Sequence, residues 1–368
     1  MEKVTLSNYG YYAANIEINA SCNMACTFCP YPIKEDKKTK LPIEDVKKIL
    51  DQIDPNDEKL EYIAFAQVNE PLLDNRFFEI AEYAKKSGLP VRLTTNGVLL
   101  NKEKNVEGIF RLKPDVKISL QVLDSNLHKT ARGLNLDLDK YVKTIIDFCK
   151  KAKDKDFNVQ VTIGCNFNSK FSHSLKTILG LSTGDPSVPR DIKTSIIRLK
   201  QILKMFYEIS DEEYKENIKA LANIDEMKKI FDKNYANQDG FNIYKNVDVK
   251  IRCFWYGKKL SEFKPIDNNF SCNSTNLGIL ASGHIVPCCI AYTTDIAIGK
   301  ASDGNLKQTL DTSQLLKNLR KKGGEKKLTC RKCFGEPTHR GTIVKKMYFS
   351  LPEKVRNSKF IKFFTQSY

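Results

Sequence analysis

The chain has 368 residues, which is enough for one large domain and a smaller one, and its 41% hydrophobic content is enough for a packed core. Neither the first ten residues nor any later stretch has the apolar length of a signal sequence or a membrane-spanning helix. The formal net charge is +16, but the lysines are interleaved with acidic residues and no basic run contains stacking aromatics. We therefore expect a cytoplasmic protein that binds neither membranes nor nucleic acid.

The cysteines are the most informative residues. Eleven cysteines in a reducing compartment are more often metal ligands or core residues than disulfide partners. Three of them, Cys22, Cys26 and Cys29, directly follow an alternating stretch at residues 15–20 that predicts a short strand. Three thiolates can bind one soft metal centre, but this is one ligand fewer than a cubane iron–sulfur cluster needs. One iron would therefore remain open to a small molecule.

Helices and strands alternate after this loop. Apolar periodicity predicts amphipathic helices over residues 41–53 and 77–88, and Gly88 is a natural stop for the second. Further strands are predicted at residues 62–66, 91–95, 115–120, 158–163 and 247–251. Strands that alternate with helices predict a parallel sheet covered by helices.

Polar residues follow the ends of these predicted strands. Glu70 comes after the second strand, Asn96 after the third, and Ser119 ends the fourth. Because the loops at the carboxyl ends of parallel strands hold the functional sites, we expect these residues to gather at one edge. Between about residues 170 and 240 the pattern is less regular, with helices predicted at 196–206 and 212–231, and we interpret it as a helical elaboration of the same domain.

The cysteine spacing, the preceding strand and the aromatic Phe28 before the third cysteine together resemble the signature of the radical S-adenosylmethionine (radical SAM) superfamily. This resemblance implies an α/β fold, a partial (β/α)6 TIM-like barrel, with a [4Fe-4S] cluster on Cys22, Cys26 and Cys29 and with SAM on the fourth iron. One electron would then cleave SAM to methionine and a 5′-deoxyadenosyl radical, which takes a hydrogen atom from the substrate. The competing interpretation, a structural zinc site, normally has four protein ligands.

The same resemblance implies contacts to SAM. Asn69 and Glu70 occupy the place of a Gly-Gly-Glu-Pro-like turn that receives the amino group of SAM, and asparagine tolerates a positive φ there. Ser119 and Arg132 match positions near the ribose and the carboxylate, with which a guanidinium can pair bidentately. Phe28 would flank the adenine. Each has an ordinary alternative, as a surface carboxylate, a strand end or a packing aromatic.

A second group of cysteines lies towards the C-terminus. Four thiolates from Cys272, Cys288, Cys330 and Cys333 can close a tetrahedral zinc site or a cubane cluster, and their spacing does not decide between them. Their arrangement resembles the SPASM-type extension of radical SAM enzymes, which implies one auxiliary [4Fe-4S] cluster. No cysteine follows Cys333, so the extension is a shortened one. Cys289 is an alternative to Cys288, and a fully ligated cluster would serve electron transfer or structure.

These features predict three parts of the chain. Residues 1–252 form the radical SAM core, with the elaboration at about 170–240; residues 253–345 form the SPASM-like auxiliary domain; and residues 346–368 form a C-terminal tail. Within the auxiliary domain, residues 277–289 predict a hairpin that turns at Ser282-Gly283.

Three other cysteines have weaker signals. Cys149 lies on the apolar face of a predicted helix and is expected in the core. Cys165 and Cys253 follow predicted strands, and Cys253 is a candidate hydrogen donor to a substrate radical because a thiol has that role in some related epimerases. Burial as a small hydrophobic residue is the commoner fate of both.

The expected function is that of a radical SAM enzyme of the oxidoreductase or epimerase type. We expect a small polar substrate, such as a sugar, an aminoglycoside or a nucleotide-linked sugar, and an external electron donor such as flavodoxin or ferredoxin. The alternative is a peptide that is cross-linked or epimerised; the early start of the barrel leaves little room for a leader-binding domain, which favours the small molecule. A non-catalytic iron–sulfur protein is the third possibility.

Overall fold

The computed structural model describes residues 2–27, 29–121, 132–164, 240–252, 263–336 and 338–356, together with residues 129, 178–181, 197, 201–203, 205 and 206. Phe28, Cys165 and Cys253 lie outside the described residues, as do the predicted helix at 212–231 and most of the one at 196–206. The roles predicted for these residues stay predictions.

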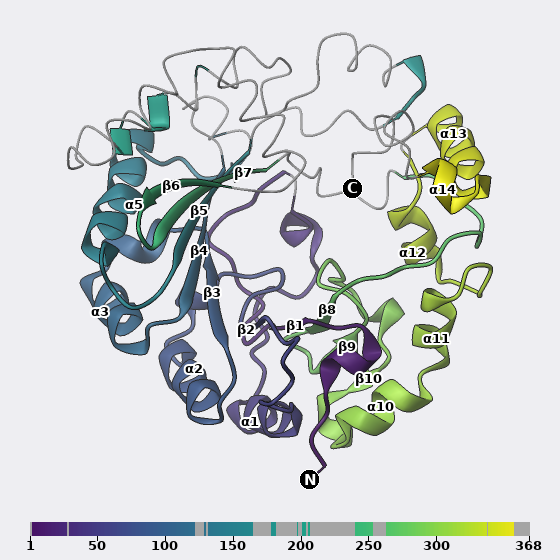
Figure 1. Ribbon diagram of the computed structural model, residues 1–368, viewed down its shortest axis with the longest axis horizontal. Helices are drawn as coiled ribbons and strands as arrows, with labels where there is room; N and C mark the ends of the chain where they lie inside the picture. Colours follow the sequence, from purple (N-terminus) through teal and green to yellow (C-terminus); the bar gives the residue numbers. More distant parts are fainter. Residues whose placement is uncertain are drawn as a thin grey trace.

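Six of the parallel strands in a ten-stranded sheet are those that the sequence predicts for the barrel (Figure 1). Their order is β1 to β5 followed by β7, and each predicted strand is found, with its bounds shifted by a few residues. The strands are β1 (Ala13–Ile16), β2 (Tyr62–Ala64), β3 (Val91–Thr95), β4 (Asp115–Gln121), β5 (Val159–Gly164) and β7 (Val247–Arg252). The outermost strands of the sheet do not pair with each other, so the barrel is open and the predicted partial (β/α)6 barrel is confirmed.

Helices cover the outer face of this sheet (Figure 1). They are α1 (Ile43–Gln52), α2 (Phe77–Lys86), α3 (Glu103–Leu112) and α5 (Leu138–Ala152). In α2 the buried residues Phe77, Ile80, Ala81 and Ala84 recur at helical spacing, which packs one stripe on the sheet. Cys149 of α5 is fully buried, as expected for a core residue. Each large apolar side chain buried in this way contributes about 1.5–3 kcal/mol.

The C-terminal part joins the same sheet rather than standing apart. Strand β8 (Asn276–Ile279) pairs in parallel with β1, and β9 (His284–Val286) and β10 (Gly299–Lys300) extend the edge antiparallel. The hairpin β8–β9 confirms the predicted turn, where Gly283 adopts a φ of 79°. The opposite edge carries β6 (Gly240–Tyr244), antiparallel to β7, which the sequence did not indicate.

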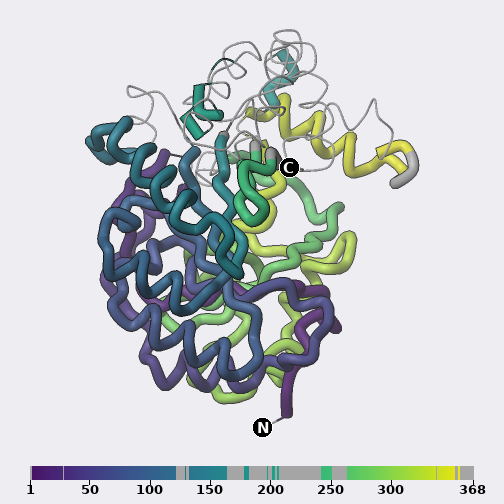
Figure 2. Tube along the Cα trace, turned by 60° about the vertical axis from the view of Figure 1, so that its left-hand side comes forward, coloured from purple at the N-terminus to yellow at the C-terminus, as the bar shows by residue number. Residues whose placement is uncertain are grey.

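Short helices follow β10, and the last of them, drawn in yellow, lie at the end of the molecule away from the N-terminus (Figure 2). They are α10 (Leu306–Thr312), α11 (Gln314–Arg320), α12 (Leu328–Cys333), α13 (His339–Ser350) and α14 (Glu353–Arg356). Single 3₁₀ turns occur at Leu6–Tyr9, Tyr31–Ile33, Pro71–Leu73, Val98–Asn101, Thr294–Ile296 and Ala301–Asp303. None of the helices in the described parts is long and apolar enough to cross a membrane. The predicted boundaries at residues 252 and 345 stay predictions.

Candidate iron–sulfur and SAM sites

The first three cysteines lie on the loop between β1 and α1. The sulfur of Cys22 accepts a hydrogen bond from the Met24 amide (3.5 Å), and that of Cys29 accepts one from the Tyr31 amide (3.4 Å). Burial raises the pKa of Cys22 to about 12, and it does the same to the pKa of Cys29. Thiols with such a pKa stay protonated at neutral pH unless a metal binds them. Hydrogen bonds from amides to sulfur are a usual means of tuning the reduction potential of an iron–sulfur cluster.

Arg132 places a buried positive charge against this loop. Its guanidinium donates to the backbone oxygen of Ser119 (2.9 Å) and to the side chain of Gln121, while its own backbone oxygen accepts from the Ala25 amide (3.0 Å). Burial alone would lower the pKa of Arg132, but the adjacent Cys26, together with Tyr141 and Cys22, raises it overall. The structure therefore brings Arg132 to the predicted site, beside the cysteines.

The chain after Arg132 passes unusually close to the cysteine loop. Gly133 has a φ of 64°, and a Cβ added there would lie 2.8 Å from both the Cβ and the backbone oxygen of Ala25. Both the backbone conformation and the close contact require glycine at this position. The sequence gave no indication of this contact, because it joins two segments more than one hundred residues apart.

Glu70 lies fully inside the molecule at the carboxyl end of the sheet. One carboxylate oxygen accepts from Thr95 Oγ1 (2.8 Å) and the Leu72 amide (3.2 Å), and the other accepts from the Asn96 amide (2.8 Å). Burial raises the pKa of Glu70 to about 7, and these hydrogen bonds oppose the rise. A carboxylate has about four acceptor positions, so capacity for one further donor remains. The alternative of an ordinary surface carboxylate does not fit this burial.

Asn69 and Ser119 make only local contacts among those described for the site. Asn69 accepts from the Gln67 amide (2.8 Å) through its side chain and is not among the described residues with a positive φ, so this turn needs no left-handed residue there. Ser119 contributes its backbone oxygen to Arg132. A bulge follows, at which Gln121 takes a φ of 63°.

The sequence predicts that Asn96 lies near the site, but it assigns no function to this residue. Its side-chain amide donates to Asn23 Oδ1 (2.7 Å) and lies 4.0 Å from the sulfur of Cys22. Tyr141 donates to the backbone oxygen of Asn96 from the helix behind it. Only the position of Asn96 after a predicted strand indicates from the sequence that it lies near the site. No such sequence feature indicates this for Gln121 or Tyr141.

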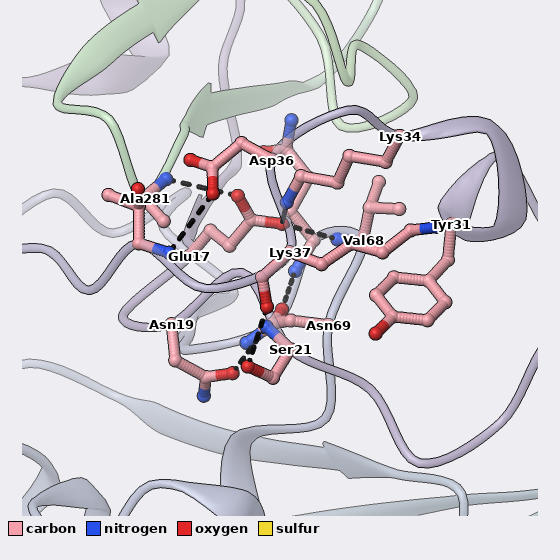
Figure 3. Close-up of polar contacts among 12 residues, drawn as sticks. Glu17, Asn19, Ser21, Tyr31, Lys34, Asp36, Lys37, Val68, Asn69 and Ala281 are labelled. Carbon is pink, nitrogen blue, oxygen red and sulfur yellow. Dashed lines mark hydrogen bonds and ion pairs between the residues drawn. The ribbon is translucent and has the colours of Figure 1, made fainter.

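A buried ion pair connects this loop to the C-terminal hairpin (Figure 3). Glu17, directly after β1, accepts from Lys34 Nζ (2.7 Å) and the Val68 amide (3.3 Å) with one oxygen and from the Ala281 amide (3.0 Å) with the other. The side chains of Glu17 and Lys34 are 1% and 6% exposed. One carboxylate therefore fixes the cysteine loop, the loop after β2 and the turn of the hairpin relative to one another.

The later cysteines gather around a second, smaller core. Cys330 is buried in it, and Cys272 and Cys288 pack against it. The pKa of Cys288 is raised by burial and then by neighbouring thiols that include Cys333 and Cys272, and the same two thiols add to the effect of burial on Cys330. The four thiols predicted as ligands are therefore near one another.

Cys289 belongs to the same group. Burial raises its pKa, the thiols of Cys272 and Cys333 add to the rise, and Lys117 of β4 opposes it. The choice between Cys288 and Cys289 as ligand thus stays open.

Both groups have the chemistry of iron–sulfur ligands, because they offer only thiols as soft donors. Within the described parts of the chain, no three Cys, His, Asp or Glu side chains are grouped so that they could hold a metal ion as they stand. The individual ligands remain predictions.

Comparison with known proteins identifies the two regions. The sequence model of the Radical SAM superfamily matches residues 16–168, and that of the SPASM iron-sulfur cluster-binding domain matches residues 271–334. The chain therefore contains a radical SAM region followed by a SPASM region. Domains of the first kind bind SAM and a [4Fe-4S] cluster, and those of the second kind bind auxiliary iron–sulfur clusters. The short second match agrees with the shortened extension expected from the cysteines.

Individual relatives match over short stretches. The tungsten-containing aldehyde ferredoxin oxidoreductase cofactor-modifying protein of Pyrococcus furiosus is 33% identical over 88 residues, 24% of either chain. The mycofactocin maturase MftC of Mycolicibacterium smegmatis is 25% identical over 119 residues, 32% of this chain and 29% of that protein. The alignments thus span less than a third of these relatives.

A solved structure matches over most of the chain. The crystal structure of Streptococcus suis SuiB superposes with a TM-score of 0.52 at 15% identity, covering 86% of this chain and 70% of SuiB. At this identity the likeness shows a shared fold. SuiB itself has also been crystallised with the precursor peptide SuiA.

Proposed function

We propose that this radical SAM protein is an enzyme that removes a hydrogen atom from a substrate carbon, with its chemistry starting at the N-terminal cysteine loop. The observation that carries the proposal is the junction of this loop with the strand ends: the thiols of Cys22 and Cys26 lie beside Arg132, and Asn96 reaches Cys22. Three thiols next to a cation and a hydrogen-bond donor suit a cluster in which one iron stays free to bind SAM.

Bound SAM and cluster would supply a 5′-deoxyadenosyl radical: one electron from an external donor of the flavodoxin or ferredoxin class is consumed, the carbon–sulfur bond of SAM breaks to give methionine, and 5′-deoxyadenosine forms when the substrate gives up a hydrogen atom. The residues of the chain bind and orient these groups. Cys22, Cys26 and Cys29 hold the iron, and Phe28 flanks the adenine.

Four further residues complete the proposed SAM site. Glu70 and Asn69 receive the amino group, and Arg132 with Ser119 faces the carboxylate and ribose. The buried position of Glu70 and the guanidinium beside the cysteines support these roles. Arg132 also holds the end of β4 through Ser119 and Gln121, so it would position the loop as well as contact SAM.

The auxiliary region is proposed to hold one [4Fe-4S] cluster on Cys272, Cys288, Cys330 and Cys333. Four thiols close to one another would leave no open iron, so we assign this cluster to electron transfer or structure. The role of Cys253 as a hydrogen donor stays a proposal.

A peptide substrate is better supported than the small polar molecule expected from the sequence. MftC is a maturase, and the fold resembles that of SuiB, a protein crystallised with a precursor peptide. The names of the relatives described above point to no particular sugar or aminoglycoside. We therefore propose that the chain modifies a peptide, with the reaction outcome, cross-linking or epimerisation, left to experiment.

The test starts with anaerobic reconstitution of the full chain with iron and sulfide. Addition of SAM and dithionite should release 5′-deoxyadenosine, measured by chromatography, and the iron content should approach about eight atoms per chain. No 5′-deoxyadenosine from loaded protein, with or without candidate peptides, would reject the enzyme; about four irons with one zinc would reject the auxiliary cluster. Peptides encoded beside this gene, compared with sugars by mass spectrometry, test the substrate class.

A further inference from the structure

Lys326 is a buried cation next to the auxiliary cysteines. It is 5% exposed, and its ammonium donates to the backbone oxygens of Gly324 (2.8 Å), Lys321 (2.9 Å) and Asn268 (3.3 Å). These three acceptors are neutral. Within the described chain it forms no ion pair with a carboxylate, so its positive charge is not cancelled by a neighbouring acid.

The thiols of Cys272 and Cys330 lie close enough to Lys326 to interact with its charge. Burial lowers the pKa of Lys326, whereas Cys272 and Cys330 raise it, and Lys326 in turn opposes the rise in the pKa of Cys330. The ammonium also lies over the Phe270 ring, 4.8 Å from its centre, in a cation–π contact. Three carbonyls and one ring therefore hold a full positive charge in place beside two proposed cluster ligands.

We propose that Lys326 raises the reduction potential of the auxiliary cluster and so makes this cluster a better electron acceptor. The inference rests on the proposed auxiliary site. The cluster gains one negative charge when it takes one electron from its donor, and a fixed positive charge nearby stabilises the reduced form more than the oxidised form. Burial strengthens this effect, because solvent and salt do not screen the interaction as they would at the surface.

Lys326 acts through its charge as well as through its hydrogen bonds. Its hydrogen bonds also close the turn after α11, and a merely structural lysine would be replaceable by any donor that keeps those bonds. Lys326→Gln keeps a donor and removes the charge, whereas Lys326→Arg keeps the charge. Lys327→Gln is the matched control, since Lys327 is exposed and adjacent in sequence.

The experiment is a redox titration of the reconstituted full chain, monitored by electron paramagnetic resonance. The signal of the auxiliary cluster is the one that persists when Cys22, Cys26 and Cys29 are replaced by alanine. We expect Lys326→Gln to shift the auxiliary midpoint to a lower potential, and Lys326→Arg and Lys327→Gln to leave it near that of the unchanged chain. An equal midpoint in Lys326→Gln and the unchanged chain would overturn the proposal.

Iron content and circular dichroism are read before each titration. Loss of the auxiliary cluster in Lys326→Gln but not in Lys326→Arg would also support the need for a charge, whereas loss in both would assign the lysine to structure and overturn the proposal. An unchanged chain that holds no auxiliary cluster would instead show that the proposed site is wrong, before Lys326 is tested at all.

Discussion

The two cysteine groups are built in different ways. One continuous loop carries Cys22, Cys26 and Cys29. The residues beside this loop come from the ends of several strands. The later cysteines come from well-separated segments that meet only because a small second core brings them together. The first group has three thiols and polar neighbours that suit a small molecule, whereas the second has enough thiols to close a cluster. This contrast supports our proposal of SAM chemistry at the first group and of electron transfer or structure at the second.

The largest expected effect is on the release of 5′-deoxyadenosine when one cysteine of either group is replaced. Cys26→Ala should abolish release of 5′-deoxyadenosine, because a cluster with two protein ligands on this loop would not be retained in the form that binds SAM. Cys330→Ala should lower the iron content by about half and still release 5′-deoxyadenosine with dithionite, since that donor can reduce the first cluster directly. Equal loss of release in both variants, with both still folded by circular dichroism, would contradict the division of roles.

The next effect tests the connection between the two regions. Glu17→Ala leaves Lys34 buried without its partner and removes the acceptor of the Ala281 amide, so we expect a loss of about 3–5 kcal/mol in the free energy of unfolding. Urea denaturation of the metal-free chain measures it. The control is Glu79→Ala, which breaks the exposed pair with Lys47 and should cost less than about 1 kcal/mol.

Similar costs for the two variants would mean that the buried carboxylate does not connect the loops. A Glu17→Ala chain that remains stable but loses iron from both groups together would, in contrast, extend its importance to cluster assembly.

Glu70 gives the first region a pH dependence of its own. Its pKa is raised from 4.5 to about 7, so the folded chain binds a proton that the unfolded chain releases between these values. Stability of the metal-free chain should therefore fall as the pH rises through this window, by up to roughly 3 kcal/mol. Glu70→Gln should remove that slope in urea denaturation at pH 5 and pH 8. An unchanged slope would show that another group titrates there.

Local patterns predicted much of this molecule. Alternation and helical periodicity located six of the parallel strands, and the short spacing of Cys22, Cys26 and Cys29 predicted the first site because its proposed ligands lie within eight residues. Contacts between distant segments could not be read in this way. The pairing of β8 with β1 joins strands about 260 residues apart, and Lys326 lies in a basic stretch that looks like an ordinary solvated surface.

The smallest expected effect concerns the contact that closes the first region. Gly133→Ala places a methyl group 2.8 Å from Ala25 and forces a side chain into a left-handed conformation. We expect it to cost about 1–3 kcal/mol and to weaken iron retention, because the cysteine loop must move away. Gly304→Ala is the matched control: Gly304 has a φ of 81°, but a Cβ there meets nothing within 4 Å, so only the backbone term remains.

The difference between the two glycine variants isolates the contact. If Gly133→Ala lowers both stability and iron retention more than Gly304→Ala, the segment after Arg132 supports the cysteine loop by direct packing. If the two variants behave alike in urea denaturation and iron analysis, the loop adapts to the added methyl group, and Arg132 must position it through its hydrogen bonds to the end of β4 and the Ala25 amide instead. Arg132→Lys would then be the more damaging change, because a lysine cannot donate to Ser119 and Gln121 in the same fork geometry.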